Sequence, residues 1–278
     1  MANNQPAIRL SGAALSMGGR LLWQDLNLDV KPGEFVAVLG PNGSGKTSLL
    51  KVLLGLLPLS SGSVEVCGRE PMRGSSHIGY VPQRQSFDPD LPLRGRDLVR
   101  LGLDGPKFGL NFNGANTANK VEEAIREVGA AEYADSPVGL LSGGEQQRLR
   151  IAQALVGGPQ VLLCDEPLLS LDLSHQQAVS NLIDARRRKA NTAVVFVTHE
   201  INPVLPLVDR VLYLVGGRFA VGKPTEVLTS ETLSDLYGTT VDVIRVRGRI
   251  VVVGTGDTVL AEAGGHHVHA SRGSRGSH

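Results

Sequence analysis

The chain of 278 residues has few cysteines, almost no net charge and no long apolar run. Its two cysteines, Cys67 and Cys164, are far apart in the sequence, which argues against a disulfide framework and favours a reducing cytoplasm. Lys and Arg number 28 against 27 for Asp and Glu, so no bulk positive field attracts nucleic acid. Nowhere do about 18 apolar residues run together, and the start does not resemble a secretion signal. We therefore predict no nucleic-acid partner, and a membrane role only through another subunit.

What the chain does contain is a succession of short apolar runs separated by turn signals, typical of a loop-rich α/β protein. Strands and turns fill the first forty residues, helical patterns fill residues 92–158, and buried strands return in QVLLCDE and TAVVFVTHE. Within the helical part, we expect LDGPKFGLNFNGANT to form a surface loop. A basic run, Arg186–Arg188, lies in the helix between the two later strands, and we predict that it is a solvated face.

The end of the chain differs from the rest. Residues 231–254 predict a short helix followed by an alternating hairpin that turns at Gly248. Residues 255–278 are rich in Gly, Ser and His and are predicted to be a disordered tail. His266, His267 and His269 could hold a metal ion weakly, but the closing RGSH resembles an expression-tag junction. We therefore predict no metal site in the tail.

A glycine-rich segment from Gly40 to Thr47 fits the pattern G-x-x-x-x-G-K-[ST] and lies between a buried strand and a helix. Glycines let backbone N–H groups wrap phosphates, Lys46 reaches the terminal phosphates, and the Thr47 hydroxyl can bind Mg²⁺. Ser48 follows at the start of the helix, where its hydroxyl could also reach a phosphate. A plain turn between strand and helix would need none of this set, so the segment predicts a nucleotide site.

Two adjacent carboxylates, Asp165 and Glu166, end the apolar strand VLLCDE. One can hold the metal while its neighbour polarises the attacking water. Solvated charge is a poor explanation at the end of such an apolar run. Combined with the phosphate loop, the pair predicts hydrolysis of a nucleoside triphosphate.

A second anion site is predicted at LSGGEQQR, residues 141–148, where a serine and two glycines precede a helix. The order of this segment, the phosphate loop, VLLCDE, the SLD of Ser170–Asp172 and the THE of Thr198–Glu200 resembles the ATP-binding subunit of ABC transporters over roughly residues 8–254. The resemblance implies a P-loop NTPase of the ABC ATPase fold: a mixed, largely parallel sheet core, an antiparallel β subdomain and a helical signature subdomain. Residues 1–230 would be the ABC ATPase domain.

The resemblance also implies roles for individual residues. Asp165 would hold Mg²⁺ with Thr47 and Gln83, Glu166 would be the catalytic base, and His199 would contact the γ-phosphate. Gln83, in YVPQ, would also couple the nucleotide to a membrane partner. In trans, a second copy would supply Ser142, Gly143, Gly144 and Asp172. The ATP-binding set would be Gly40, Pro41, Asn42, Gly43, Ser44, Gly45, Lys46, Thr47, Ser48 and Met17.

One position departs from the family pattern. An aromatic residue usually stacks on adenine about two dozen residues before the phosphate loop, and here Met17 in LSMGGR stands there. A thioether covers a purine face with less stacking energy, so we expect looser base recognition. Trp23 is nearby, but its place in LLWQDL predicts a core residue.

The resemblance narrows the function to one subunit of a multi-subunit transporter at the cytoplasmic face of the membrane. Ser142 follows Thr47 by 95 residues (142 − 47), which leaves no room for the long coiled coil of the chromosome-organising relatives. Cargo is indicated only by kinship: segments around Gln83, the signature and the C-terminus are similar to importers of manganese, zinc and iron. The expected partners are a second copy, permease subunits and an extracytoplasmic metal-binding protein. Uptake of iron chelates or cobalamin, export of lipids or drugs, and a purely regulatory nucleotide-binding module remain alternatives.

Overall fold

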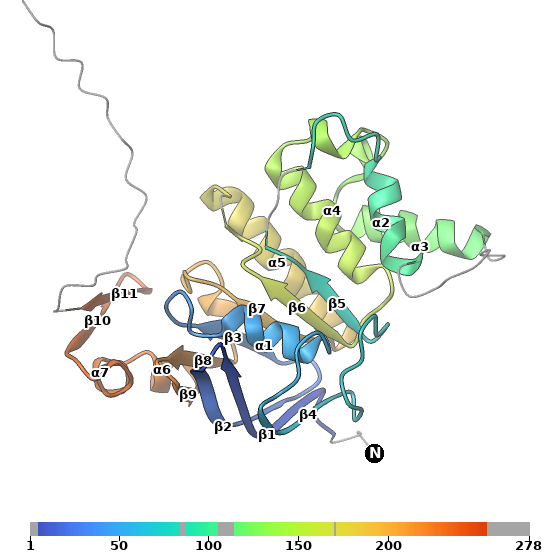
Figure 1. Ribbon diagram of the computed structural model, residues 1–278. Helices are drawn as coiled ribbons and strands as arrows, with labels where there is room; N and C mark the ends of the chain where they lie inside the picture. The colour runs from blue at the N-terminus through green and yellow to red at the C-terminus, as the bar shows by residue number, and fades with distance from the viewer. Residues whose placement is uncertain (1–4, 84–86, 105–113, 170, 255–278) are drawn as a thin grey trace, which may run out of the picture.

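The computed structural model describes residues 5–83, 87–104, 114–169 and 171–254 (Figure 1). The predicted tail at residues 255–278 and Ser170 of the SLD motif lie outside these ranges. A six-stranded sheet forms the centre of the molecule, with a three-stranded antiparallel sheet on one side and a group of helices on the other. This is the α/β architecture that the sequence predicts.

The central sheet is parallel except at one edge. Its strands, in spatial order, are β5 (Ile78–Val81), β6 (Val161–Asp165), β7 (Ala193–Val197), β3 (Phe35–Leu39), β8 (Arg210–Val215) and β9 (Arg218–Gly222), with β9 antiparallel to β8. Every residue of β3, β6 and β7 is buried. Such continuous apolar strands form where both faces of a parallel sheet are covered.

The smaller sheet has the order β2–β1–β4, and its strands are β1 (Ile8–Met17), β2 (Arg20–Val30) and β4 (Ser61–Val66). Buried and exposed residues alternate along most of β1 and β2, as expected of an antiparallel sheet with one solvated face. Trp23, on β2, is fully buried in the core between the two sheets, as predicted. The short turn between β1 and β2 brings the end of β1 towards the start of helix α1 (Lys46–Leu53).

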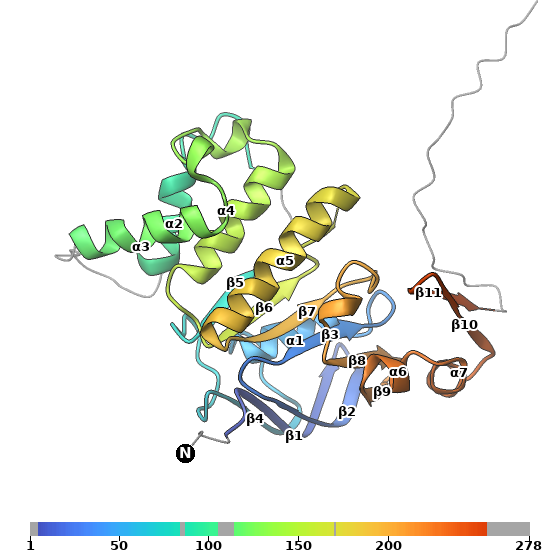
Figure 2. The ribbon, with the colours of Figure 1, turned by 180° about the vertical axis from the view of Figure 1, so that it is seen from behind.

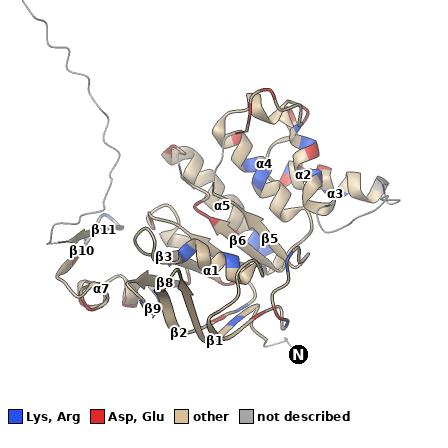
Figure 3. Cartoon of the chain, viewed as in Figure 1, with Lys and Arg blue, Asp and Glu red and all other residues tan. Residues whose placement is uncertain are grey.

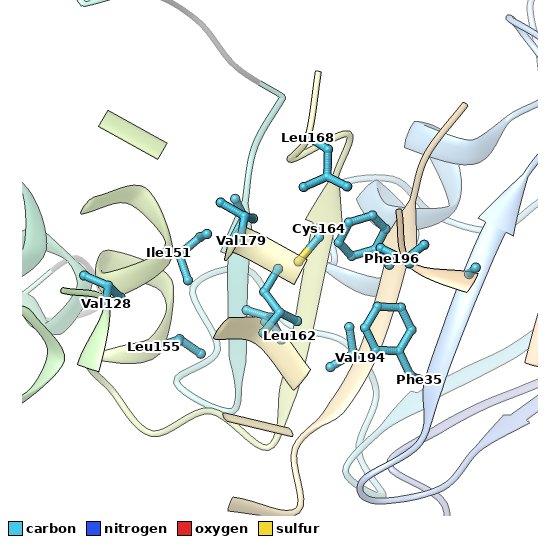
Figure 4. Packing of buried hydrophobic residues seen from close by; sticks show 14 of the residues in the cluster. Phe35, Val128, Ile151, Leu155, Leu162, Cys164, Leu168, Val179, Val194 and Phe196 are labelled. Atoms are coloured by element: carbon cyan, nitrogen blue, oxygen red, sulfur yellow. The ribbon is translucent and has the colours of Figure 1, made fainter. Parts of the chain in front are cut away.

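Two apolar cores cover the two faces of the central sheet. Along β3, Phe35 and Ala37 belong to one core while Val36 and Val38 belong to the other, because successive strand residues point to opposite faces. Helix α1 packs on the face towards the small sheet, and α5 (Leu173–Ala190) packs on the opposite face, as Figures 1 and 2 show. In Figure 4, residues of the β strands, α4 and α5 meet in the core that contains Phe35, where the ring centroids of Phe35 and Phe196 lie 5.5 Å apart.

The helical region contains α2 (Gly95–Asp104), α3 (Gly114–Glu127) and α4 (Gly143–Leu155), with 3₁₀ turns at Ala131–Tyr133 and Val138–Leu140. It falls within the predicted range 92–158. Residues 105–113 of the predicted surface loop lie outside the described ranges, whereas its two ends are helical, because α2 ends at Asp104 and α3 begins at Gly114. Lys and Arg alternate with Asp and Glu over this region, in keeping with the balanced composition (Figure 3).

The arginine run is not entirely a solvated face. Arg187 is buried, and its guanidinium contacts Asp184, Asp209 and the carbonyl oxygen of Gly33. It also lies over the ring of Phe35 at 5.8 Å. The prediction was wrong at this position because a helix of 18 residues turns one side of its basic run towards the core.

The last described part of the chain contains a 3₁₀ turn at Leu205–Leu207 and, after β8 and β9, α6 (Pro224–Val227), α7 (Ser230–Tyr237) and a hairpin of β10 (Val241–Val246) and β11 (Arg249–Gly254). The helix and the hairpin turning at Gly248, which has φ 79°, are as predicted. Val241 and Ile250 are buried in the same core as Phe35. The hairpin therefore packs on the ATPase domain through one of its faces.

Candidate functional site

The phosphate loop runs from the end of β3 to the start of α1. Gly40, Gly43 and Gly45 all have positive φ angles, of 138°, 75° and 96°. A side chain at Gly40 would clash with the carbonyl oxygen of Leu214, so glycine is required there by close approach as well as by φ. The loop leads directly into the N-terminus of α1, whose first backbone N–H groups suit a phosphate.

Lys46 lies folded over this loop and is only 5% exposed. Its Nζ donates hydrogen bonds to the carbonyl oxygens of Gly40 and Pro41, at 2.7 and 3.0 Å. Burial lowers the pKa of Lys46, and the carboxylates of Glu166 and Asp165 oppose that shift. Within the same loop, the Ser44 hydroxyl is buried without a hydrogen-bond partner among the described residues. Both groups suit an anion that would enter the loop.

Asp165 ends β6 next to the phosphate loop. Its Oδ1 accepts a hydrogen bond from the Thr47 hydroxyl at 3.2 Å, and the Tyr80 hydroxyl donates to the same carboxyl group. Burial raises the pKa of Asp165 despite these donors. Burial and the neighbouring Asp165 raise the pKa of Tyr80 to about 12, so the phenol keeps its proton. Buried oxygens of this kind fit a hard divalent cation such as Mg²⁺.

Glu166 stands at the next position, in a left-handed backbone conformation with φ 49° that a non-glycine residue seldom adopts. Its Oε1 lies 2.5 Å from Nε2 of His199, and its Oε2 accepts a hydrogen bond from Nε2 of Gln83 at 3.0 Å. The structure thus brings together three residues that are distant in sequence. In this arrangement the Gln83 amide is bonded to Glu166, and the described contacts do not join it to Asp165 or Thr47.

The predicted signature forms the N-terminus of α4. Ser142 caps the helix, and Glu145 completes a capping box: the Ser142 hydroxyl and backbone N–H both donate to Glu145 Oε2, at 2.7 and 2.8 Å. Gly144 has no room for a side chain, because a Cβ there would lie 2.7 Å from the ring of His175. The carboxylate of Glu145 therefore occupies the two Ser142 donors, which the sequence assigns to a phosphate.

Asp172 caps α5 in the same manner. Its carboxylate accepts hydrogen bonds from the Ser174 hydroxyl and the His175 backbone N–H, and its other oxygen lies 2.7 Å from Nδ1 of His175. These donors hold the pKa of Asp172 well below its ordinary value. Through His175, the residue is tied to the signature helix of its own chain.

Met17 lies beside the phosphate loop, where the sequence places it. Its sulfur is 3.6 Å from the Ser48 hydroxyl, and the side chain is 46% exposed. Arg20 is a further neighbour, since its guanidinium is 3.7 Å from the position of a Cβ on Gly43. Trp23 is excluded as a base-stacking residue by its complete burial.

The two segments predicted to bind anions lie apart within one chain. The phosphate loop follows β3 in the central sheet, whereas the signature begins α4 in the helical region (Figure 1). Among the described residues, no hydrogen bond or ion pair joins residues 142–145 to residues 40–48.

Comparison with known proteins decides the family. The family model described as ABC transporter matches residues 23–169, which is more than half of the chain.

This chain belongs to the ABC transporter family.

A zinc import ATP-binding protein, ZnuC of Halorhodospira halophila, is 37% identical over 238 residues, which are 85% of this chain and 85% of that protein. Among solved structures, an inward-facing metal-chelate type ABC transporter matches with a TM-score of 0.77 and 27% identity, over 91% of this chain and 99% of that one. An ATP-binding cassette solved as a dimer with ADP and Pi matches with a TM-score of 0.66 and 27% identity, over 78% and 98%. These likenesses confirm the ABC ATPase fold.

ATP hydrolysis is the activity of this family, and the chain is an ABC-type ATPase. The cassette solved with ADP and Pi is a dimer. In the part of the chain that the structure describes, no helix is both long and apolar enough to cross a membrane.

Sequence reasoning missed three neighbours of the ABC site. Tyr80 donates to Asp165, Glu145 binds the signature serine, and His175 lies against Gly144. Of these, Glu145 had a visible signal, because Ser142-x-x-Glu145 is a capping box. Tyr80 reaches the site because of the order of strands in the sheet, and His175 because of the packing of helices. The sequence around these two residues carries no signal for either arrangement.

Proposed function

We propose that this ATPase powers the import of zinc through separate permease subunits. The observation that carries the proposal is the 37% identity, over 85% of both chains, to a zinc import ATP-binding protein. Cargo does not touch this subunit, so kinship is the source of the assignment. Manganese, the other cargo expected from the sequence, is chemically similar but is supported by the resemblance alone.

The contacts of the phosphate loop support a binding mode for ATP. Lys46 would exchange the carbonyl oxygens of Gly40 and Pro41 for the β and γ phosphates, and the unpartnered Ser44 hydroxyl would gain an acceptor. Thr47 and Asp165 would hold Mg²⁺, which would neutralise charge on the phosphates. Gln83 would join that metal site after leaving Glu166. Met17 would cover the base.

Hydrolysis would use the carboxylate of Glu166 as the base. It would accept a proton from the attacking water, while His199 holds it in place through one of its two oxygens. His199 would then face the γ-phosphate. The strained backbone of Glu166 supports this role, since such conformations gather at functional sites.

The signature supports a sandwich of two copies with two ATP molecules between them. Ser142, Gly143 and Gly144 lie at a helix N-terminus that is separate from the phosphate loop of its own chain. The phosphate loop of a second copy would bring them a γ-phosphate, with Asp172 lining the seam. Glu145 would have to release Ser142 for this contact.

In the membrane complex, the ATPase would lie at the cytoplasmic face, below its permease, and an extracytoplasmic metal-binding protein would deliver zinc. Gln83 would couple the nucleotide to the permease through the segment that follows it. Leu91 on that segment is exposed, whereas Phe87 packs beneath Arg150 at 4.2 Å and is less free to bind a partner.

Iron-chelate uptake is the second candidate, because a metal-chelate type transporter gives a TM-score of 0.77. The lower identity of that match, 27%, favours zinc.

Metal accumulation in proteoliposomes that carry the whole complex tests the assignment. We expect ATP-dependent uptake of zinc with the parent chain and none with Glu166→Gln. Gln83→Ala should reduce transport more than basal hydrolysis, and deletion of residues 264–278 should change neither. Uptake of a metal chelate without uptake of free zinc or manganese would refute zinc import and leave the ATPase assignment intact.

A further inference from the structure

The C-terminal hairpin has one face that nothing in the described part of the chain covers. From the register of β10 and β11, Val241, Val243, Ile250 and Val252 share one face, and these four are buried or packed against the core. The opposite face carries Ile244, Val246, Val251 and Val253, which are 48%, 52%, 46% and 38% exposed. A two-stranded sheet with an apolar face open to water is marginal by itself.

Opposite charges stand at the two ends of this outer face. Asp242 pairs in register with Val253 at the open end of the hairpin, and Arg249 pairs with Val246 at the turn. They are separated by about 14 Å, four residues at the strand repeat, which is too far for an ion pair within one hairpin. Neither side chain has a hydrogen-bond or ion-pair partner among the described residues. The outer face is thus an apolar strip that is acidic at one end and basic at the other.

A strip of this kind is complementary to itself under twofold rotation. A twofold axis perpendicular to the line from Asp242 to Arg249 brings Asp242 of each hairpin opposite Arg249 of the other and places the central Ile244 and Val251 against their equivalents. A partner of another kind would have to present the same pattern in reverse. The charge arrangement therefore favours a second copy of this chain as the occupant.

The hairpin lies beside the expected dimer seam. Asn202, three residues after His199, binds β11 through both atoms of its amide: Nδ2 donates to the Ile250 carbonyl oxygen at 3.0 Å, and Oδ1 accepts from the Ile250 N–H at 2.8 Å. In Figures 1 and 2 the hairpin lies beyond the loops that follow β3 and β7, on the side of the molecule where those loops emerge.

We propose that the outer faces of the two C-terminal hairpins pack against each other in the ATP-bound dimer, as a second contact next to the nucleotide seam. This rests on the sandwich dimer of the proposed function. Four small apolar residues on each copy are far fewer than a stable interface needs, so the hairpins pair only when ATP holds the copies together. Through Asn202, this pairing would also support the segment that carries His199.

A charge exchange tests the pairing in the full chain carrying Glu166→Gln, with dimerisation in ATP measured by analytical ultracentrifugation. Asp242→Arg and Arg249→Asp, each made alone, should raise the dimer dissociation constant about fivefold, because two ion pairs per dimer become like-charge contacts. The double variant Asp242→Arg with Arg249→Asp should restore the parent value. Glu65→Arg, an exposed change on the distant strand β4, is the matched control and should have no effect.

Cross-linking provides a measurement that does not depend on charge. In a Cys67→Ser background, in which Cys164 is fully buried, Val251→Cys should be joined to its equivalent by a short bismaleimide with ATP and not without it. Glu65→Cys should not cross-link under the same conditions.

The outcomes separate the two proposals. If the Glu166→Gln chain does not dimerise in ATP, the sandwich falls and the hairpin pairing falls with it. If it dimerises while the charge variants match the parent and Val251→Cys stays uncross-linked, only the hairpin pairing is overturned. Cross-linking of Val251→Cys to a permease subunit in the whole complex, in place of the second copy, would overturn it as well.

Discussion

Replacing Glu166 with Gln should slow ATP hydrolysis by about 10²- to 10⁴-fold, the contribution typical of a positioned general base. This corresponds to about 3 to 5 kcal/mol of transition-state stabilisation. Gln has the shape of Glu but cannot accept a proton from water at neutral pH. The phosphate loop and Asp165 are untouched, so ATP binding should persist.

The local contacts indicate that the fold tolerates this change. Glu166 accepts from His199 and Gln83 through different oxygens, and a Gln at this position keeps only one acceptor. The Gln83 amide can rotate and accept from the new NH₂ group, so the loss is about 1 kcal/mol for one weakened hydrogen bond. The thermal unfolding temperature should accordingly shift by only a few degrees.

Phosphate release in Mg-ATP, measured beside ATP binding by calorimetry, checks this prediction. Glu200→Gln removes the exposed carboxylate next to His199 and is the matched control, expected to retain parent activity. Turnover of Glu166→Gln within a few-fold of the parent would show that another group is the base. Lost ATP binding would show that the site had collapsed.

Further predictions concern the base, the seam, the core and a helix cap. Met17→Tyr should tighten nucleotide binding by about 0.5 to 1.5 kcal/mol in a titration, since the exposed Met17 leaves space for a ring; no gain would mean that another residue covers the base. Ser142→Arg should abolish the ATP-dependent dimer of the Glu166→Gln chain in size exclusion, and a surviving dimer would contradict the signature's role. Arg187→Ala should cost about 3 kcal/mol in denaturant unfolding because it removes a buried guanidinium that bonds Asp184, Asp209 and the Gly33 carbonyl oxygen, whereas Arg188→Ala, at a residue 69% exposed, should cost less than about 1 kcal/mol. The folded pKa of Asp172 is depressed, so the carboxylate stabilises the fold above the ordinary carboxyl pKa, and this stabilisation is lost as pH falls towards the folded pKa. The difference in unfolding free energy between the parent and Asp172→Ala should therefore shrink below about pH 4. A difference that does not change with pH would refute the role of Asp172 as a cap.

Local patterns were enough to predict the elements that carry the ATP site. The phosphate loop, the strand ending in Asp165 and Glu166, and the helix that follows Ser142 all depend on residues within about ten positions of one another, and the structure forms each of them. Their backbone requirements are local as well: positive φ at glycine, capping by serine, and burial of a continuous apolar strand. The family likeness rests on the same segments.

Other features were decided by tertiary structure alone. Glu166, Gln83 and His199 meet because β5, β6 and β7 are neighbours in the sheet, and no local pattern states that order. Arg187 is buried because Phe35 and Asp209 come from other elements to receive it, although Arg188 and Lys189, which follow it in sequence, are basic and exposed. The outer face of the C-terminal hairpin is open because α7 and the core cover only the other side. An amino-acid sequence by itself determines what each segment can become, since that depends on short-range sterics and periodicity. Which segments meet depends on long-range packing, which only the folded chain decides.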